Sequence, residues 1–357
     1  MQTMVTDCAA PEEAPAAASE VSPHRLEFTA TAREYFRIWV VNLALTLVTL
    51  GVYSAWAKVR RNRYLYASTR IDGDAFEYRG RPIPILKGRI LAVAVTAVVY
   101  SVAHWWIRYF WPMVAGLFVF MPWLMVRSFA FRAHNTAWRN VRMRFDGTYW
   151  RSIAIIAFYG LFTVLTLGLG YFVAKARYTE FVAGHHAYGA TRFEVSGLRR
   201  AFFGIYGLAI LLGLGAGVVV GLAASQIVFW THSVLERSPL MYAFNLLVYV
   251  IYLGFFAYLR ARTTNAMWNA AQLGAVRFHS TLGVRRLFAI YAVNILAILA
   301  TAGFATPWAV VRTLRYRLEC FEVIAPGGLG AFAAADSPEV SAAGEEVGQM
   351  LDFDFSL

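Results

Sequence analysis

Charged residues are scarce in this chain, and their scarcity excludes an ordinary soluble domain. Asp, Glu, Lys and Arg make up 15% of the 357 residues, against roughly a quarter in a typical globular protein. Hydrophobic residues reach 59% and gather in long uncharged windows. Such windows can cross the hydrocarbon of a bilayer once they are about 18 residues long. The composition therefore predicts an all-α polytopic integral membrane protein.

The chain also has few cysteines, and its first residues do not resemble a targeting sequence. Cys8 and Cys320 are the two cysteines, so neither a disulfide framework nor a cysteine metal site is predicted. The segment that precedes Leu26 lacks both a basic start and an apolar core, so it does not form a secretory signal peptide. Residues 1–27 and 326–357 are rich in small and acidic residues, and we expect two disordered tails.

Motifs for catalysis are missing as well. The chain has no GxSxG, P-loop, HExxH or CxxC motif, so no enzyme activity, cofactor or metal is expected. His104 has no second ligand at metal-like spacing, and His185 and His186 are adjacent rather than one helical turn apart. Glu77 and Glu194 lie beside many arginines, which suits surface ion pairs better than acid–base chemistry.

Lysine is rare, whereas arginine is abundant. The chain has three lysines and 30 arginines, and its net charge is +12. A soluble protein with this balance would suggest nucleic acid. In a membrane protein, basic loops instead mark the cytoplasmic side and meet anionic lipid. The expected partners are the lipid bilayer, anionic lipid head groups and further copies of the chain in a homo-oligomer, with no nucleic acid.

An internal repeat organises the chain around residues 49–80. Adding 117 returns the same residue type at no fewer than ten positions between Phe28 and Gly80, and adding 252 does so at no fewer than ten positions between Arg33 and Tyr64, with glycine and arginine in register. A hydrophobic background alone would not preserve such positions. The candidate motif positions are Asn42, Thr49, Gly51, Trp56, Arg60, Thr166, Gly168, Arg177, Asn294, Thr301, Gly303, Trp308 and Arg312.

The repeat predicts about seven apolar helices with basic, aromatic interfacial segments between them. The order is one helix plus a hairpin, a second helix plus a hairpin, and a last helix alone. The predicted repeats cover residues 28–131, 132–261 and, in part, 262–325. Turn residues around Ala75–Tyr78 also predict a small β-hairpin outside the hydrocarbon.

Two topologies fit these windows. If all seven segments cross the membrane, basic loops fall on both sides. If the three motif helices instead enter and leave on one side, or lie in the interface, only Arg108 and Arg237 face outward. Basic residues prefer the cytoplasmic side, so we favour the same-side arrangement. A buried turn in such a helix would need protein or water around it.

One stretch resembles a known family. Residues 35–89 resemble the signature of the YjgN family of bacterial inner-membrane proteins, most specifically through TLGVYSAWAKVRRNRY and IDGDAFEYRG. The resemblance covers residues 28 to about 325. The second repeat departs from it, with Val173 in place of Trp56 and Gly170 in place of Tyr53. The resemblance implies a polytopic inner-membrane protein and carries over no catalytic residue, because the family has no established activity.

The motif residues have structural and functional interpretations. Asn42 and Asn294 could join helices or line a polar cavity, and joining helices is favoured. The threonine–glycine positions could break a helix or contact a substrate, and the break is favoured. Gly213, Gly217 and Gly221 form a small-residue stripe that predicts close helix packing, with a pore or lipid groove as the alternative.

Two function classes remain open. The first is a transporter- or permease-like module for a small solute or lipid, because transporters often place sites at broken helices in repeats. The second is a non-transporting structural or interaction protein of the cell envelope. The apolar windows contain no Asp, Glu, Lys or Arg, so an ion relay has no carrier. The sequence favours the first class through architecture alone.

Overall fold

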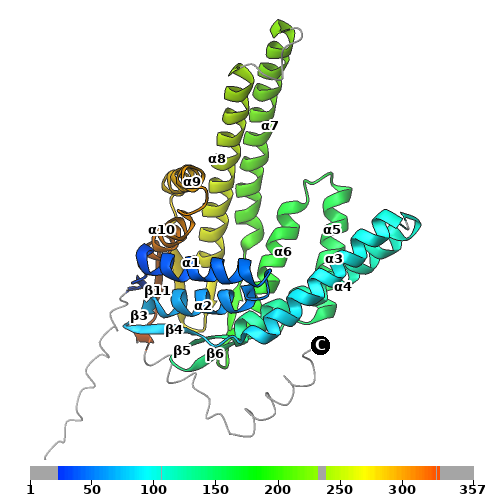
Figure 1. The fold of residues 1–357 in the computed structure, drawn as a ribbon. Helices are drawn as coiled ribbons and strands as arrows, with labels where there is room; N and C mark the ends of the chain where they lie inside the picture. The colour runs from blue at the N-terminus through cyan, green and yellow to red at the C-terminus, as the bar shows by residue number, and fades with distance from the viewer. Residues whose placement is uncertain (1–22, 106, 232–238, 327, 330–357) are drawn as a thin grey trace, which may run out of the picture.

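A computed structural model describes residues 23–105, 107–231, 239–326 and 328–329 (Figure 1). Helical hairpins stand on a base of short strands. The helices are α1 (Ala32–Val48), α2 (Ser54–Ala67), α3 (Pro82–Trp105), η1 (Ile107–Tyr109), α4 (Phe110–His134), α5 (Tyr149–Leu165), α6 (Tyr171–Gly184), α7 (Leu198–Thr231), α8 (Pro239–Ala270), α9 (Val284–Ala300) and α10 (Thr306–Glu319). The strands are β1 (Pro23–Arg25), β2 (Glu27–Phe28), β3 (Thr69–Ile71), β4 (Asp74–Tyr78), β5 (Thr136–Trp138), β6 (Val141–Phe145), β7 (His186–Tyr188), β8 (Thr191–Val195), β9 (Ala271–Leu273), β10 (Val276–Ser280) and β11 (Phe321–Ile324).

The strands correct the all-α prediction. They pair antiparallel in the order β1-β11-β10-β9-β8-β7-β6-β5-β4-β3-β2. Between successive helical hairpins, a three-residue strand and a five-residue strand are joined by a two-residue turn. The hairpin predicted around Ala75–Tyr78 is confirmed as β3 and β4. The others were missed because such short strands hold too few residues for a clear alternating pattern.

The base also includes residues assigned to the N-terminal tail. Strands β1 and β2 lie at Pro23–Arg25 and Glu27–Phe28, and Leu26 alone separates them. Because β1 pairs with β11 while β2 pairs with β3, this segment joins the two ends of the chain. The tail boundary at residue 27 is therefore too late. The rest of both predicted tails, apart from residues 326 and 328–329, lies outside the described residues.

Four helices in the described part of the chain, rather than about seven, are long and apolar enough to cross a membrane. They are α3, α4, residues Leu198–Gln226 of α7 and residues Tyr242–Ala270 of α8. Their apolar side chains are largely exposed, as expected for surfaces that meet lipid. In Figure 1, α7 and α8 rise together away from the base.

The three motif segments form helical hairpins rather than single long helices. Helices α1, α5 and α9 each have 17 residues, about 25 Å, which is short of the ~30 Å hydrocarbon core. Each one ends at a tight turn and packs against the 14-residue helix that follows it. The long apolar windows in the sequence had counted residues on both sides of this turn. Helices α1 and α2 run across the direction of α7 and α8 (Figure 1).

The helical hairpins close into a ring. Neighbouring pairs contact each other along the chain, and α10 also packs against α1. The ring of Trp39 in α1 lies 6.1 Å from that of Phe304, in the turn between α9 and α10. Arg315 of α10 donates a 3.0 Å hydrogen bond to the carbonyl of Ala30 before α1. The first and last hairpins are thus neighbours in space although they stand at opposite ends of the described chain.

Candidate functional site

The threonine–glycine motif forms the same turn at three places. Helices α1, α5 and α9 end where Thr49, Thr166 and Thr301 cap them. Gly51, Gly168 and Gly303 have φ values of +92°, +90° and +95°. The favoured interpretation, a helix break, agrees with this geometry.

Hydrogen bonds show why the three residues from threonine to glycine reverse the direction of the chain. The Gly168 N–H donates to the carbonyl of Thr163, five residues earlier in the chain, at 2.7 Å. A hydrogen bond with this separation is typical of a helix that ends at a glycine. The Thr166 hydroxyl donates to Phe162 at 2.8 Å and accepts from the Gly170 N–H at 2.7 Å. Threonine thus ends one helix and starts the next. The same bonds recur at the other two turns.

The two motif asparagines join the arms of their hairpins. Asn42 is buried in α1 and donates to the carbonyl of Ala57 in α2 at 3.4 Å. Asn294 is buried in α9 and donates to the carbonyl of Ala309 at 3.3 Å and to the Thr313 hydroxyl at 2.9 Å, both in α10. These contacts support a role in joining helices. The side-chain oxygen of each asparagine has no hydrogen-bond partner among the described residues.

The remaining motif residues do not converge on one site. Trp56 stacks on Tyr53 with ring centroids 6.3 Å apart, and Arg60 is exposed on α2. Arg177 donates to Glu180 at 3.3 Å within α6. In α10, the Arg312 guanidinium lies 5.0 Å from the centre of the Trp308 ring. Each hairpin holds its own copy of the motif, so the ring keeps the copies apart.

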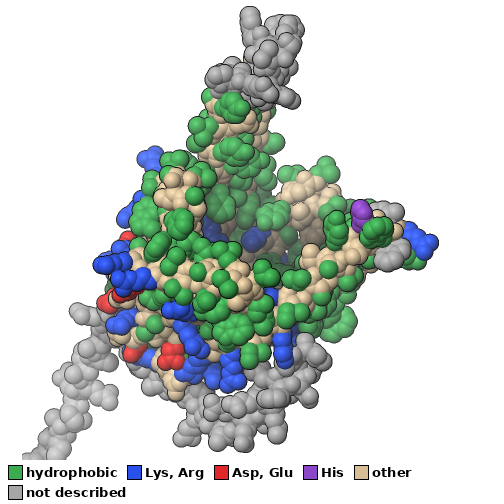
Figure 2. Space-filling model, in the orientation of Figure 1, with side chains coloured by type: hydrophobic (Ala, Val, Ile, Leu, Met, Phe, Trp, Pro, Cys, Tyr) green, Lys and Arg blue, Asp and Glu red, His purple; other side chains and the backbone are tan. Residues whose placement is uncertain are grey.

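A different set of basic residues interacts between helices that are not neighbours along the ring, such as α2 with α4 and α6 with α8, which places the set toward the space inside the ring. Figure 2 shows a hollow between the helices with Lys and Arg side chains deep within it. Electrostatic neighbours identify a chain of cations from six helices, which we call the central basic cluster. Its members are Lys58 (α2), Arg89 (α3), Arg132 (α4), Lys175 (α6), Arg260 (α8) and Arg317 (α10).

The two lysines of the cluster lie in a less polar environment than bulk water. Burial lowers the pKa of Lys58 from its usual value, and the positive charges of Arg132, Arg89 and Arg61 lower it further. Burial likewise lowers the pKa of Lys175, with an additional contribution from Arg260. Burial disfavours a charged amine and neighbouring cations repel it. An anion bound near either lysine would therefore stabilise its charged form.

Helices α4, α6, α8 and α10 share these electrostatic contacts. The Lys175 amine lies 5.7 Å from the ring centre of Tyr178, one turn along α6. Burial raises the pKa of Tyr178, and Arg132 of α4 opposes that rise. On the other side, burial and then Arg260 lower the pKa of Arg317. Tyr178 and Lys175 thus link the cations near α4 to those near α8 and α10.

No carboxylate neutralises the cluster within the described ranges. The arginines that form ion pairs with carboxylates are not members of the cluster: they are Arg25, Arg79, Arg139, Arg144, Arg177, Arg192 and Arg286. Arg89 donates to the hydroxyl of Ser54. Repulsion among like charges in a partly desolvated space costs free energy unless anions enter. The arrangement is suited to holding an anionic group.

The histidines, Glu77 and the glycine stripe were the other candidates from the sequence, and the structure shows what surrounds them. The rings of His185 and His186 bond the backbone carbonyls of Phe181 and Val182, and His104 stacks on Tyr100. The described chain contains no group of three or more metal-ligating side chains. Glu77 pairs with Arg79 at 2.7 Å. A Cβ on Gly217 or Gly221 would meet no atom within 4 Å, so these two glycines are not in close helix packing within the described chain.

Comparison with known proteins gives the family. The sequence profile of a family of bacterial proteins of unknown function, DUF898, matches residues 23–350. The chain belongs to the DUF898 family. The chain is also similar to relatives named inner membrane protein YjgN, including one from Escherichia coli O157:H7, 26% identical over 223 residues, and one from Salmonella typhimurium, 21% identical over 341 residues. This confirms the resemblance noted in residues 35–89.

The extent of these matches differs. The Escherichia coli O157:H7 alignment covers 60% of this chain and 52% of the relative, whereas the Salmonella alignment covers 80% and 84%. A third YjgN protein, from Escherichia coli K12, is 44% identical over 59 residues, which is 16% of this chain and 15% of the relative. No solved structure matches. With the four apolar helices, the relatives place this DUF898 protein in the bacterial inner membrane.

Sequence reasoning missed the central basic cluster. Its members lie near the ends of apolar windows, where a basic residue normally marks the cytoplasmic side of a helix. That explanation was sufficient for each residue taken alone. Only closure of the helical ring brings six such positions around one space.

Proposed function

We propose that this DUF898 protein binds an anionic lipid of the cytoplasmic leaflet in the hollow between its helical hairpins. The observation that carries the proposal is the central basic cluster, whose six cations have no carboxylate partner in the described chain. A lipid phosphate would neutralise cations there. The exposed apolar side chains on the surrounding helices would meet the acyl chains.

The orientation that suits this proposal places the strand base in the cytoplasm. The helical hairpins begin and end at the base, which is rich in basic residues, while Arg108 lies at the far end of the α3–α4 hairpin. Basic segments near helix ends prefer the cytoplasmic side. The central basic cluster would then lie near the head groups of the inner leaflet, where anionic lipids concentrate.

The base of the hollow favours binding over free passage along the ring axis. Side chains from β3, β5, β7, β9, β10 and β11 form one buried apolar cluster in the sheet, including Ile71, Trp138, Tyr188, Leu273 and Val323. A charged solute crossing this layer would lose its hydration without polar partners. The permease-like function expected from the sequence stays a prediction. The envelope-structural alternative stays one also.

Retention of lipid through purification tests the proposal. In the full chain, Lys175→Gln combined with Arg317→Gln removes two cations that both interact electrostatically with Arg260. We expect at least a threefold drop in co-purified phosphatidylglycerol per protein, measured by mass spectrometry of extracted lipid. Arg277→Gln, at an exposed position on β10, is the matched control and should retain wild-type lipid. Equal lipid content in all three proteins would refute binding in the hollow.

A stability measurement provides an independent prediction. Because the pKa of Lys175 is lowered in the folded protein, its charged form destabilises the fold below that pKa. This penalty fades as the pH rises through the lowered value toward the unfolded one. At pH 7 and without lipid, Lys175→Met should therefore raise the thermal midpoint. Lys87→Met, at an exposed lysine of α3, should leave it unchanged. A lower midpoint for Lys175→Met would contradict the burial argument.

A further inference from the structure

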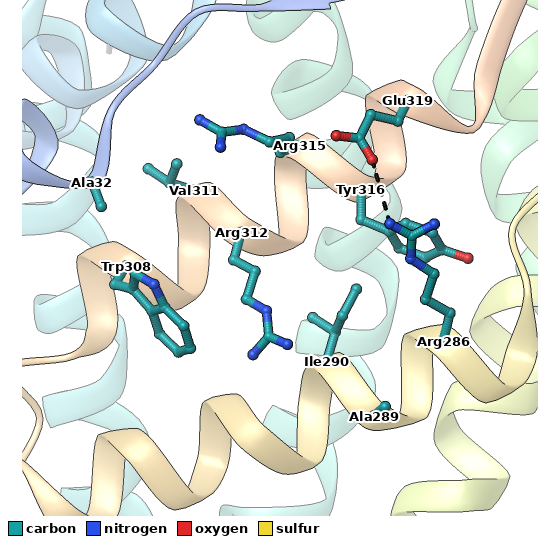
Figure 3. Close-up of a pocket in the computed structure, with 10 residues that line it drawn as sticks. All are labelled: Ala32, Arg286, Ala289, Ile290, Trp308, Val311, Arg312, Arg315, Tyr316 and Glu319. Atoms are coloured by element: carbon teal, nitrogen blue, oxygen red, sulfur yellow. Dashed lines mark ion pairs between the residues drawn. The ribbon is translucent and has the colours of Figure 1, made fainter.

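A second candidate site lies between α9 and α10, outside the central basic cluster. It is a cavity of about 480 Å³ lined by both helices and by Ala32 at the start of α1. Figure 3 shows the Arg312 and Trp308 side chains reaching from α10 into the space beside α9. Ala289, Ile290 and Val311 supply apolar wall. The volume falls in the range typical of small-molecule sites.

Arg312 is the cation of this cavity that lacks a polar partner among the described residues. One of its terminal nitrogens is buried and makes no hydrogen bond. The neighbouring cations are engaged: Arg315 donates to the Ala30 carbonyl at 3.0 Å, and Arg286 lies 3.8 Å from Glu319 and over the Tyr316 ring. Stacking on Trp308 occupies a face of the Arg312 guanidinium and leaves its N–H groups to hydrogen-bond in the plane.

A matching cavity between α5 and α6 provides an internal comparison. It has a volume of about 350 Å³, and adding 135 to its residues Arg151, Ala154, Ile155 and Arg177 gives four residues of the α9–α10 cavity. The decisive difference is Glu180, which stands where the other cavity has Arg315. Glu180 pairs with Arg177 at 3.3 Å. In this second cavity, Glu180 is therefore already the anionic partner of the arginine.

We infer that the α9–α10 cavity binds the phosphodiester of an anionic phospholipid through the N–H edge of Arg312. A phosphate accepts two parallel hydrogen bonds from a guanidinium, and Arg286 adds positive charge at the rim. The source is a membrane lipid because the cavity wall is largely apolar. The same hairpin also exposes Leu296, Leu299 and Phe304 near its turn, where they would enter the leaflet. The Arg177 cavity should not bind this ligand.

The test measures thermal stabilisation of the purified full chain by dioctanoyl phosphatidylglycerol. It is run in wild type and in the Lys175→Gln, Arg317→Gln background, which removes the contribution expected from the hollow. Arg312→Gln should weaken the apparent affinity at least tenfold in that background, where the hollow no longer contributes, and less in the wild-type background. Arg177→Gln, the matched control, should leave it unchanged. Arg312→Lys keeps a charge without the planar fork and should fall between wild type and Arg312→Gln.

Several results would overturn the inference. In the Lys175→Gln, Arg317→Gln background, equal affinity with and without Arg312→Gln would remove Arg312 from the site. An equal loss in Arg177→Gln would remove its specificity. Stabilisation by inorganic phosphate at the same concentration would show a site for free phosphate rather than lipid. Equal stabilisation by dioctanoyl phosphatidylcholine would show that negative charge is not recognised. If Arg312→Gln does not fold, wild-type affinity in Arg312→Lys would reject bidentate binding.

Discussion

A cysteine at position 108 is expected to react on intact cells with a membrane-impermeant thiol reagent, while cysteines at positions 60, 192 and 277 stay protected. Arg108 is exposed in η1, which joins α3 to α4 at the end of their hairpin opposite the flanking strands β4 and β5. Arg60, Arg192 and Arg277 are exposed on α2, β8 and β10, at or near that base. If both long hairpins cross the bilayer, the tip and the base lie on opposite sides.

The experiment uses single cysteines in a background carrying Cys8→Ser and Cys320→Ser. Reaction at all four positions after permeabilisation is the control for side-chain access. The expected difference is close to all-or-none, because the bilayer blocks the reagent completely. Labelling at position 192 or 277 in intact cells would contradict the same-side arrangement and require that the motif segments cross. Protection at position 108 with labelling at the other three would reverse the orientation.

Valine at Gly168 is expected to destabilise the α5–α6 hairpin strongly, whereas glycine at Leu167 is expected to stabilise it. Leu167 and Gly168 have φ values of +51° and +90°. For non-glycine residues the left-handed region costs about 1–2 kcal/mol, and more for a β-branched side chain. A Cβ on Gly168 meets no atom within 4 Å, so the effect arises from backbone conformation rather than a clash. Leu167→Gly removes the same kind of strain, by about 1 kcal/mol.

Thermal unfolding in detergent measures both effects. Gly160→Ala is the control in the same helix, because Gly160 lies in α5 with no atom near an added Cβ. Alanine there should be neutral or slightly stabilising. The paired substitutions should thus move the midpoint in opposite directions while the control moves it little. A Gly168→Val protein as stable as wild type would show that the turn tolerates another conformation and that the glycine is not required.

The local features of this fold are readable in the amino-acid sequence. Long apolar windows require lipid wherever they lie, so the membrane class follows from composition. The tripeptides at residues 49–51, 166–168 and 301–303 encode a helix end through hydrogen bonds between residues close together in the chain. The short β-hairpin at Ala75–Tyr78 also follows from its turn residues. Each of these features needs only neighbouring residues.

The number of long membrane helices was determined by tertiary packing. A long apolar window can continue as one helix or fold back on itself, and both satisfy the hydrophobic pattern. Packing between the two arms decides the outcome, as in the bond from Asn294 to Thr313 across a hairpin. The short strands are similar, because β1 is defined by pairing with β11, at the opposite end of the described chain. No local pattern encodes such a partner.

The central basic cluster is the strongest case of this dependence. Lys58, Arg89, Arg132, Lys175, Arg260 and Arg317 come from six helices spread over most of the chain. In sequence, each is a basic residue at or near the end of an apolar segment and has an adequate explanation there. Their common location arises because α10 packs on α1 and closes the ring. Coulombic repulsion acts through space rather than along the chain, so these charges become one site only in the folded structure.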